Sequence, residues 1–179
     1  METFTEFRPM VVDPRYQDRR RQCLYELNID ELDAPIAGLI DDLCEIPFCF
    51  TIQCCFGHFL YPGQEDPNNI QPLPSPGRIP SVEYRIAYIA ICLEYSHSGR
   101  KLLRWLKQFS DINPHYVQYG CAEWFWKRYP NSYVLQVEPE RHLQKDACTV
   151  DFQEALRIEK VRNKFYDHFV TLVSNIDKA

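Results

Sequence analysis

Apolar residues recur at intervals of three and four positions in several parts of this chain, a spacing that places them on one face of an α-helix. The best marked of these patterns runs through Ile29, Leu32, Ile36, Leu39, Ile40 and Leu43. We expect helices over residues 14–27, 29–43, 96–109 and 152–172.

Helix starts are marked by residues that accept hydrogen bonds from free backbone N–H groups. Ser96 or Ser98 can cap the central helix. Asp151 with Glu154 three residues later forms a capping box, the clearest start signal in the sequence. Pro35 disfavours helix at the beginning of the second stretch, because it lacks a backbone N–H and clashes with the preceding turn.

Other stretches carry runs of β-branched and aromatic residues, which favour β-strands. The sequence predicts strands over residues 48–60, 82–95, 115–129 and 132–138, the last two joined by a turn at Pro130 and Asn131. The second strand is apolar on both faces, as a central strand would be. The order of elements predicts an α+β fold, in which a mixed four-stranded sheet with an antiparallel hairpin packs with N-terminal, central and C-terminal helices.

Length and composition fit one globular unit. The chain has 179 residues, 45% of them hydrophobic and 25% charged. We expect a single domain over residues 1–179, with an arm at 1–12, a proline-rich loop at 61–80 and a charged, solvated connection at 138–151. The proline-rich loop is long enough for a lid or a mobile connector.

Charge and cysteine usage narrow the function classes. The formal net charge of −5 disfavours nucleic-acid binding through bulk electrostatics, although a local basic patch is compatible with it. No apolar run approaches the roughly 20 residues of a membrane span, and the start lacks a secretory-signal pattern, so we expect a cytoplasmic protein. We expect its eight cysteines to be reduced and mostly buried.

The stretch FTIQCCFGHF, residues 50–59, adds two thiols, a glycine and a histidine to an apolar run. Because side chains alternate along a strand, we expect Phe50, Ile52 and Cys54 to face the core. The opposite face then carries Cys49, Thr51, Gln53, Cys55 and Gly57. It is either a packed or solvated surface or one wall of a shallow cleft. Cys55 and His58 are the candidate catalytic residues, since an ordinary histidine side chain at such a strand end titrates near neutrality.

The stretch EYSHSGRK, residues 94–101, places polar groups between a strand and a helix start. Free backbone N–H groups and the helix dipole can bind an anion there, and ordinary helix capping is the alternative. If this junction meets the cysteine strand, the two segments form a cleft for a nucleotide-like or other anionic small ligand. The predicted ligand-binding residues are Thr51, Gln53, Gly57, Ser96, Ser98 and Arg100.

A metal site at the cysteine strand is disfavoured by geometry. Cys54 and Cys55 point to opposite faces, and Cys49 lies about 20 Å from Cys55 at about 3.3 Å per residue. Paired CxxC motifs are absent from the sequence. Only a turn at Gly57 that folds His58 back, with ligands from other segments, would assemble such a site, so the expectation is no metal.

The same stretch resembles the strand motif of the wybutosine-synthesising family of transfer-RNA methyltransferases. Phe50, Thr51, Cys55, Gly57 and Phe59 fall on matching positions. Gln53, Cys54 and Phe56 stand where that family has serines, and His58 replaces its arginine. The resemblance implies a related fold, S-adenosylmethionine as methyl donor and an RNA substrate.

Two classes of function therefore follow from the sequence. The first is a small-ligand cleft, which requires the strand and the helix start to converge on one concavity. The second is a non-catalytic interaction module that binds partner chains through aromatic and proline-rich surfaces. The sequence alone does not decide whether the protein is an enzyme.

Overall fold

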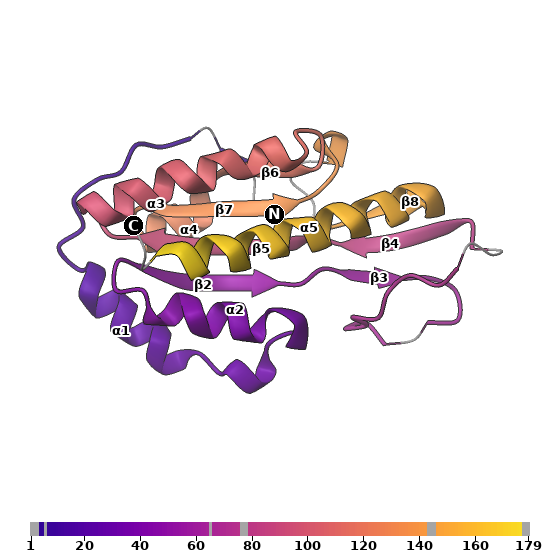
Figure 1. Cartoon of the computed structure of the whole chain (residues 1–179), viewed down its shortest axis with the longest axis horizontal. Helices are drawn as coiled ribbons and strands as arrows, with labels where there is room; N and C mark the ends of the chain where they lie inside the picture. The colour runs from indigo at the N-terminus through magenta and orange to yellow at the C-terminus, as the bar shows by residue number, and fades with distance from the viewer. Residues whose placement is uncertain (1–3, 6, 65, 76–78, 143–145, 177–179) are drawn as a thin grey trace.

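The computed structural model describes residues 4–5, 7–64, 66–75, 79–142 and 146–176, and these form an elongated α+β domain (Figure 1). The strands are β1 Phe4–Thr5, β2 Cys49–Cys55, β3 His58–Leu60, β4 Ser81–Arg85, β5 Ala87–Leu93, β6 Val117–Ala122, β7 Ser132–Val137 and β8 Ala147–Asp151. The α-helices are α1 Tyr16–Glu26, α2 Ala34–Glu45, α3 His97–Lys107, α4 Glu123–Arg128 and α5 Phe152–Ile176. Short 3₁₀ helices are η1 Ile29–Glu31, η2 Gln108–Ile112 and η3 Glu140–His142.

The strands form two sheets. One has the order β1-β6-β7-β5-β2 and the other β3-β4-β8, and every described strand pair is antiparallel. This confirms the α+β class. The arrangement differs from the expected mixed four-stranded sheet, because the N-terminal arm and the connection at 138–151 each contribute a strand, β1 and β8, that the sequence pattern did not reveal.

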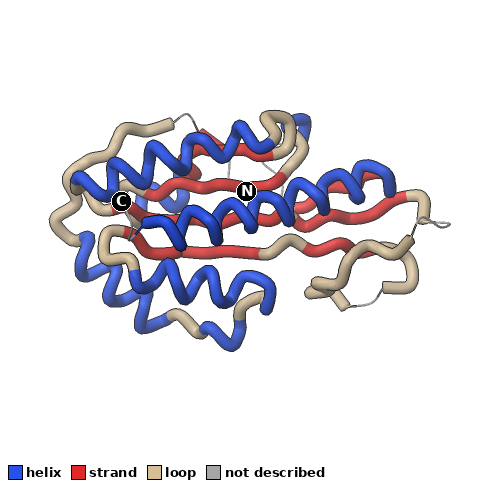
Figure 2. The backbone as a smooth tube through the Cα atoms, in the orientation of Figure 1, coloured by secondary structure: helices blue, strands red, loops and turns tan. Residues whose placement is uncertain are grey.

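Two predicted strands pass from one sheet to the other, and each breaks where it crosses. The stretch 48–60 is interrupted at Phe56 and Gly57 (Figure 2). The stretch 82–95 is interrupted at Ile86. The Tyr84 hydroxyl bridges the second break, since it accepts from the Ala87 N–H at 2.9 Å and donates to the Val137 carbonyl at 2.9 Å. The two breaks lie side by side, since Gly57 contacts Ala87, and we call this junction between the sheets, residues 55–58 with 86 and 87, the corner.

Helices cover both faces of the larger sheet. Helices α2, α5 and α3 lie across one face, and their apolar side chains join the main core (Figure 1). On the opposite face, α1 packs through Tyr16 on Phe50 and Cys92, and α4 packs through Phe125 on Ala90 and Val134. None of the helices described is long and apolar enough to cross a membrane.

The first part of strand β2, Cys49 to Thr51, is buried on both faces, which corrects the expected division into one apolar and one polar face. Cys49 lies in the main core and Phe50 in the opposite cluster. The pairing register with β5 shifts between Thr51 and Gln53, and this irregularity returns Cys54 to the main core.

The prediction of a strand over residues 123–129 is wrong, because residues 123–128 form helix α4. The aromatic run favours a strand by composition, but only Phe125 is buried among these residues and Trp124 is 50% exposed. A salt bridge of 2.7 Å between Lys127 and Glu123, one turn apart, stabilises the helical alternative.

The predicted helix starts are borne out at two positions. Ser96 caps α3 by accepting from the Gly99 N–H at 3.1 Å. Asp151 accepts from the Glu154 N–H at 2.8 Å at the start of α5. The second predicted helix divides into η1 and α2, and Pro35 lies in the first turn of α2.

Candidate functional site

The corner between the sheets depends on Gly57. Its φ is +91°, in the left-handed region that glycine adopts without a steric penalty. A Cβ at this position would lie 2.8 Å from the Ala87 Cβ, so the neighbouring strand leaves no room for a side chain. The turn at Gly57 brings the side chain of His58 back toward Cys55.

Asp33 reaches the same corner from another part of the chain. It stands at the N-cap position of α2, but its side chain does not cap that helix. Its Oδ2 instead accepts from the Phe56 N–H at 2.8 Å and lies 3.4 Å from His58 Nε2. These contacts hold the start of α2 against the corner.

Asp33, Cys55 and His58 form one cluster of potential metal ligands. The carboxylate oxygen, the thiol sulfur and an imidazole nitrogen all lie within 4.8 Å of one another. The His58 side chain is 7% exposed and that of Asp33 is 20% exposed, so the cluster is sheltered but open to solvent on the Asp33 side. Cys55 Sγ also accepts from the Gly57 N–H at 3.4 Å.

Both ring nitrogens of His58 face acceptors. Nδ1 lies 3.3 Å from the Asn69 carbonyl, and Nε2 faces Asp33. Hydrogen bonds to Asp33 and Cys55 raise the pKa of His58 to about 10, and burial opposes this only in part. Burial alone would raise the pKa of Asp33, but hydrogen bonds from His58 and the Phe56 N–H outweigh it and lower that pKa. Without a metal, the pair is an imidazolium facing a carboxylate.

Arg162, on α5, holds the other side of the corner. It is 2% exposed, and its Nη1 donates to the Gly57 carbonyl at 2.8 Å. The guanidinium lies 4.0 Å from the centre of the Phe56 ring and 5.0 Å from that of Phe59, within cation–π range. The Tyr166 hydroxyl, one turn further along α5, donates to the Cys55 carbonyl. These contacts fix the backbone on both sides of Gly57.

The proline-rich loop is attached to the same region. Asn69 is buried, its carbonyl faces His58, and its side chain donates to the Phe59 carbonyl at 3.4 Å. The Leu73 N–H donates to Glu159 of α5 at 2.8 Å. In its described part, the loop is therefore anchored against the corner.

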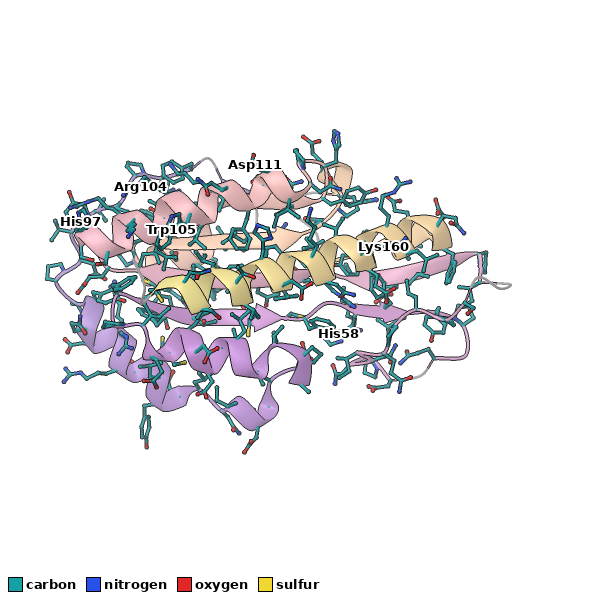
Figure 3. All side chains as sticks on the ribbon, viewed as in Figure 1. His58, His97, Arg104, Trp105, Asp111 and Lys160 are labelled. Atoms are coloured by element: carbon teal, nitrogen blue, oxygen red, sulfur yellow. The ribbon has the colours of Figure 1, made fainter. Side chains whose placement is uncertain are left out.

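The residues predicted to form a ligand cleft lie at two ends of one strand pair. Cys55 pairs with Tyr88, whereas Cys49 pairs with Leu93, just before the EYSHSGRK stretch. The two ends are about 20 Å apart at about 3.3 Å per residue. The structure brings Cys55, Gly57 and His58 together and places Ser96, Ser98 and Arg100 elsewhere. Figure 3 shows this separation, with His58 at the corner and His97 at the far end of the molecule.

The remaining predicted ligand residues are buried, cap a helix or are exposed. Thr51 is buried, and its hydroxyl has no hydrogen-bond partner among the residues described. Ser96 acts as the α3 cap, while Ser98 and Arg100 are exposed on that helix. Gln53 is exposed at the register shift in β2.

Sequence reasoning missed Asp33, Asn69 and Arg162. Arg162 carried a readable signal, because it lies on the apolar stripe of α5, between Ile158 and Phe165 at helical spacing. A cation on the buried stripe of a helix needs a partner. Nothing in the sequence links Asp33 to residues some 20 positions later.

No family model, curated protein or solved structure matches this chain. The resemblance to the wybutosine-synthesising methyltransferases therefore stays a prediction. Function is then inferred from the corner itself, with its cluster of Asp33, Cys55 and His58.

Proposed function

We propose that this protein binds a divalent transition-metal ion of the zinc class at the corner, through Asp33 Oδ2, Cys55 Sγ and His58 Nε2. The observation that carries the proposal is the convergence of one oxygen, one sulfur and one nitrogen donor within 4.8 Å. Such a mixed donor set suits zinc, which takes carboxylate, thiolate and imidazole ligands.

The surroundings of His58 support this proposal. A metal-binding histidine usually donates its second ring N–H to a carboxylate or a backbone carbonyl, which fixes the ring. The Asn69 carbonyl, 3.3 Å from Nδ1, can accept that hydrogen bond and leaves Nε2 for the ion. Binding would release the proton that the metal-free imidazolium carries, because the ligand nitrogen must be neutral.

The same geometry disfavours a cysteine nucleophile activated by a histidine and a carboxylate. In such a triad the thiol and the carboxylate take opposite nitrogens of the imidazole. Here Nδ1 faces the Asn69 carbonyl and Nε2 faces Asp33, so Cys55 has no ring nitrogen to itself.

Three protein ligands leave one position of a tetrahedral ion for water or an added ligand. Sites of this kind are typical of catalytic zinc, whereas closed structural sites use four protein ligands. A bound ion would supply a Lewis acid on the partly exposed side of the cluster, next to Asp33.

The test is a titration of the chelator-treated full chain with Zn²⁺, and with Co²⁺ as a spectroscopic probe. We expect one ion per chain and a thiolate-to-cobalt charge-transfer band in the near ultraviolet. Zn²⁺ at about 100 times its Kd should stabilise the fold by about 2.7 kcal/mol, visible as a rise in Tm of about 5–10 °C.

Matched variants separate the cluster from other metal-binding groups. Asp33→Asn, Cys55→Ser and His58→Gln should each weaken Zn²⁺ binding by about 100-fold or more. This loss is larger than the loss expected when a residue that only hydrogen-bonds to a metal ligand is changed. Asp30→Asn, Cys54→Ser and His97→Gln replace the same residue types outside the cluster and should bind like the unmodified chain. Equal losses in both sets, or no cobalt–thiolate band, would refute the proposal.

A further inference from the structure

Helix α3 presents a row of cations on its outer face. Arg100, Arg104 and Lys107 recur at spacings of four and three residues, so they lie along one side of the helix. The helix carries four Lys or Arg residues and no Asp or Glu, in a chain whose formal net charge is −5. Figure 3 marks Arg104 and Trp105 on α3, well apart from His58.

Aromatic rings, rather than carboxylates, accompany these cations. The Arg100 guanidinium lies 5.0 Å from the centre of the Tyr95 ring, and Lys107 Nζ lies 3.6 Å from that of Phe7. Among the residues described, Arg100, Arg104 and Lys107 form no salt bridge with any carboxylate. Cation–π contacts hold a side chain in place without neutralising its charge, so these side chains keep their positive charge toward solvent.

Helix stability does not explain the whole row. Cations in the last turn, such as Arg104 and Lys107, interact favourably with the helix dipole. Arg100 lies at the end of the first turn, where a cation opposes that dipole. Tyr95 remains 44% exposed beside Arg100, although large rings are more stable when buried. Phe7 supports Lys107 from below, since its ring packs against Tyr119 and Tyr133.

We propose that this face binds single-stranded nucleic acid. We define it by Tyr95, Arg100, Arg104 and Lys107, and call it the α3 face. Single strands bind surfaces on which cations lie beside an exposed ring, since phosphates pair with the cations and a base stacks on the ring. Tyr95 is that ring here. An acidic peptide would need the charges but not the ring. From Arg100 to Lys107 the helix rises about 10 Å, which matches about three stacked nucleotides.

The experiment measures fluorescence anisotropy of a labelled oligouridylate and a labelled oligothymidylate with the full chain, over a range of salt concentrations. We expect binding at about 50 mM salt that weakens toward about 200 mM, with a slope of log K against log salt of about −2 for three contacts. Arg100→Gln combined with Arg104→Gln should weaken binding at least about tenfold at low salt and reduce the slope by about 1.4.

A second variant tests the ring without changing charge. Tyr95→Leu should weaken binding about fivefold or more and leave the salt slope unaltered, because stacking is not electrostatic. The matched control combines Arg21→Gln with Lys160→Gln, which removes two exposed cations from α1 and α5 and should leave affinity and slope unchanged.

The outcomes decide the proposal. Absence of single-strand binding at low salt overturns it. So does tighter binding of a polyglutamate peptide than of the oligonucleotides, which would assign the face to an acidic protein, or an equal loss in the control pair. Failure here leaves the metal proposal intact, because that test uses other residues and another ligand.

Discussion

The two ends of the β2–β5 strand pair carry similar residue types in opposite environments. At one end Gly57 lies between Cys55 and His58, and at the other Gly99 follows Ser96. Both glycines are required sterically, because a Cβ would lie 2.8 Å from the Ala87 Cβ in the first case and 2.0 Å from the Glu94 carbonyl oxygen in the second.

Burial is the difference between the two ends. At the Gly57 end the polar groups are removed from water, so Asp33, Asn69 and Arg162 come from other segments to pair with them. At the Gly99 end the polar groups remain in water, and one cap hydrogen bond suffices. Among the residues that the structure describes, the buried end is the one that gathers donors close enough to bind an ion.

The largest expected effect comes from the buried cation of the corner. Arg162→Met should lower the free energy of unfolding by about 3 kcal/mol or more, because it leaves the buried Gly57 carbonyl without its donor and Glu159 without its cation. Urea denaturation measures this. Lys160→Met, an exposed change on the same helix, should stay within about 0.5 kcal/mol. Similar costs for the two variants would show that Arg162 does not hold the corner.

The next effect separates backbone strain from close packing. Gly57→Ala should cost about 3 kcal/mol, because the left-handed φ and the contact with Ala87 both penalise a side chain. Gly63 has the same φ of +91° but nothing within 4 Å of its Cβ position. Gly63→Ala should therefore cost only about 1–2 kcal/mol. Urea denaturation measures both variants. If Gly57→Ala and Gly63→Ala lower the free energy of unfolding equally, Gly57 and Ala87 do not approach each other as closely as the structure indicates.

A pH titration of the metal-free protein tests the charge on His58. Its pKa of about 10 in the folded protein lies above the ordinary 6.5, so its contribution to stability is fully present below about pH 6.5 and is lost as the pH rises toward 10. Stability should fall by at least about 1 kcal/mol over this range in excess of that of His58→Gln. His97→Gln, at the exposed end, should keep the alkaline decline, and an unchanged decline in His58→Gln would exclude the imidazolium.

The smallest effect belongs to the exposed end. Ser96→Ala should cost about 1 kcal/mol, the usual value for a lost helix cap. Ser98, inside the helix and exposed, has no such role, so Ser98→Ala should be neutral within about 0.5 kcal/mol. Thermal unfolding followed by circular dichroism measures both, and a larger cost for Ser98 would point to an unrecognised contact.

Local signals predicted most of the helices. The apolar spacing and the capping residues of α3 and α5 act within a few residues, so they can be read from the sequence. Strand ends were harder to predict, because the break at Ile86 and the turn at Gly57 depend on each other across the sheet. Residues 123–128 show the same limit, since their aromatic composition favours a strand while packing makes them a helix.

Part of the candidate site could be predicted from the sequence. Cys55, Gly57 and His58 are neighbours in the chain, and a turn at Gly57 was recognised as the condition for bringing the histidine back. Asp33, Asn69 and Arg162 join them through contacts that span 11 to 105 positions. Side-chain alternation also failed to describe β2, because the register shift near Ile52 changes which residues face the core.

The sequence by itself determined the α+β class, most of the helices, the caps of α3 and α5, and the reactive types gathered around Gly57, because these follow from periodicity and from short-range hydrogen bonding. Only the tertiary structure decided that the helix start at Ser96 lies far from Cys55 and that an aspartate from α2 lies beside His58. The physical reason is that an antiparallel pair sends neighbouring strand ends in opposite directions, while burial forces polar groups from distant segments to meet.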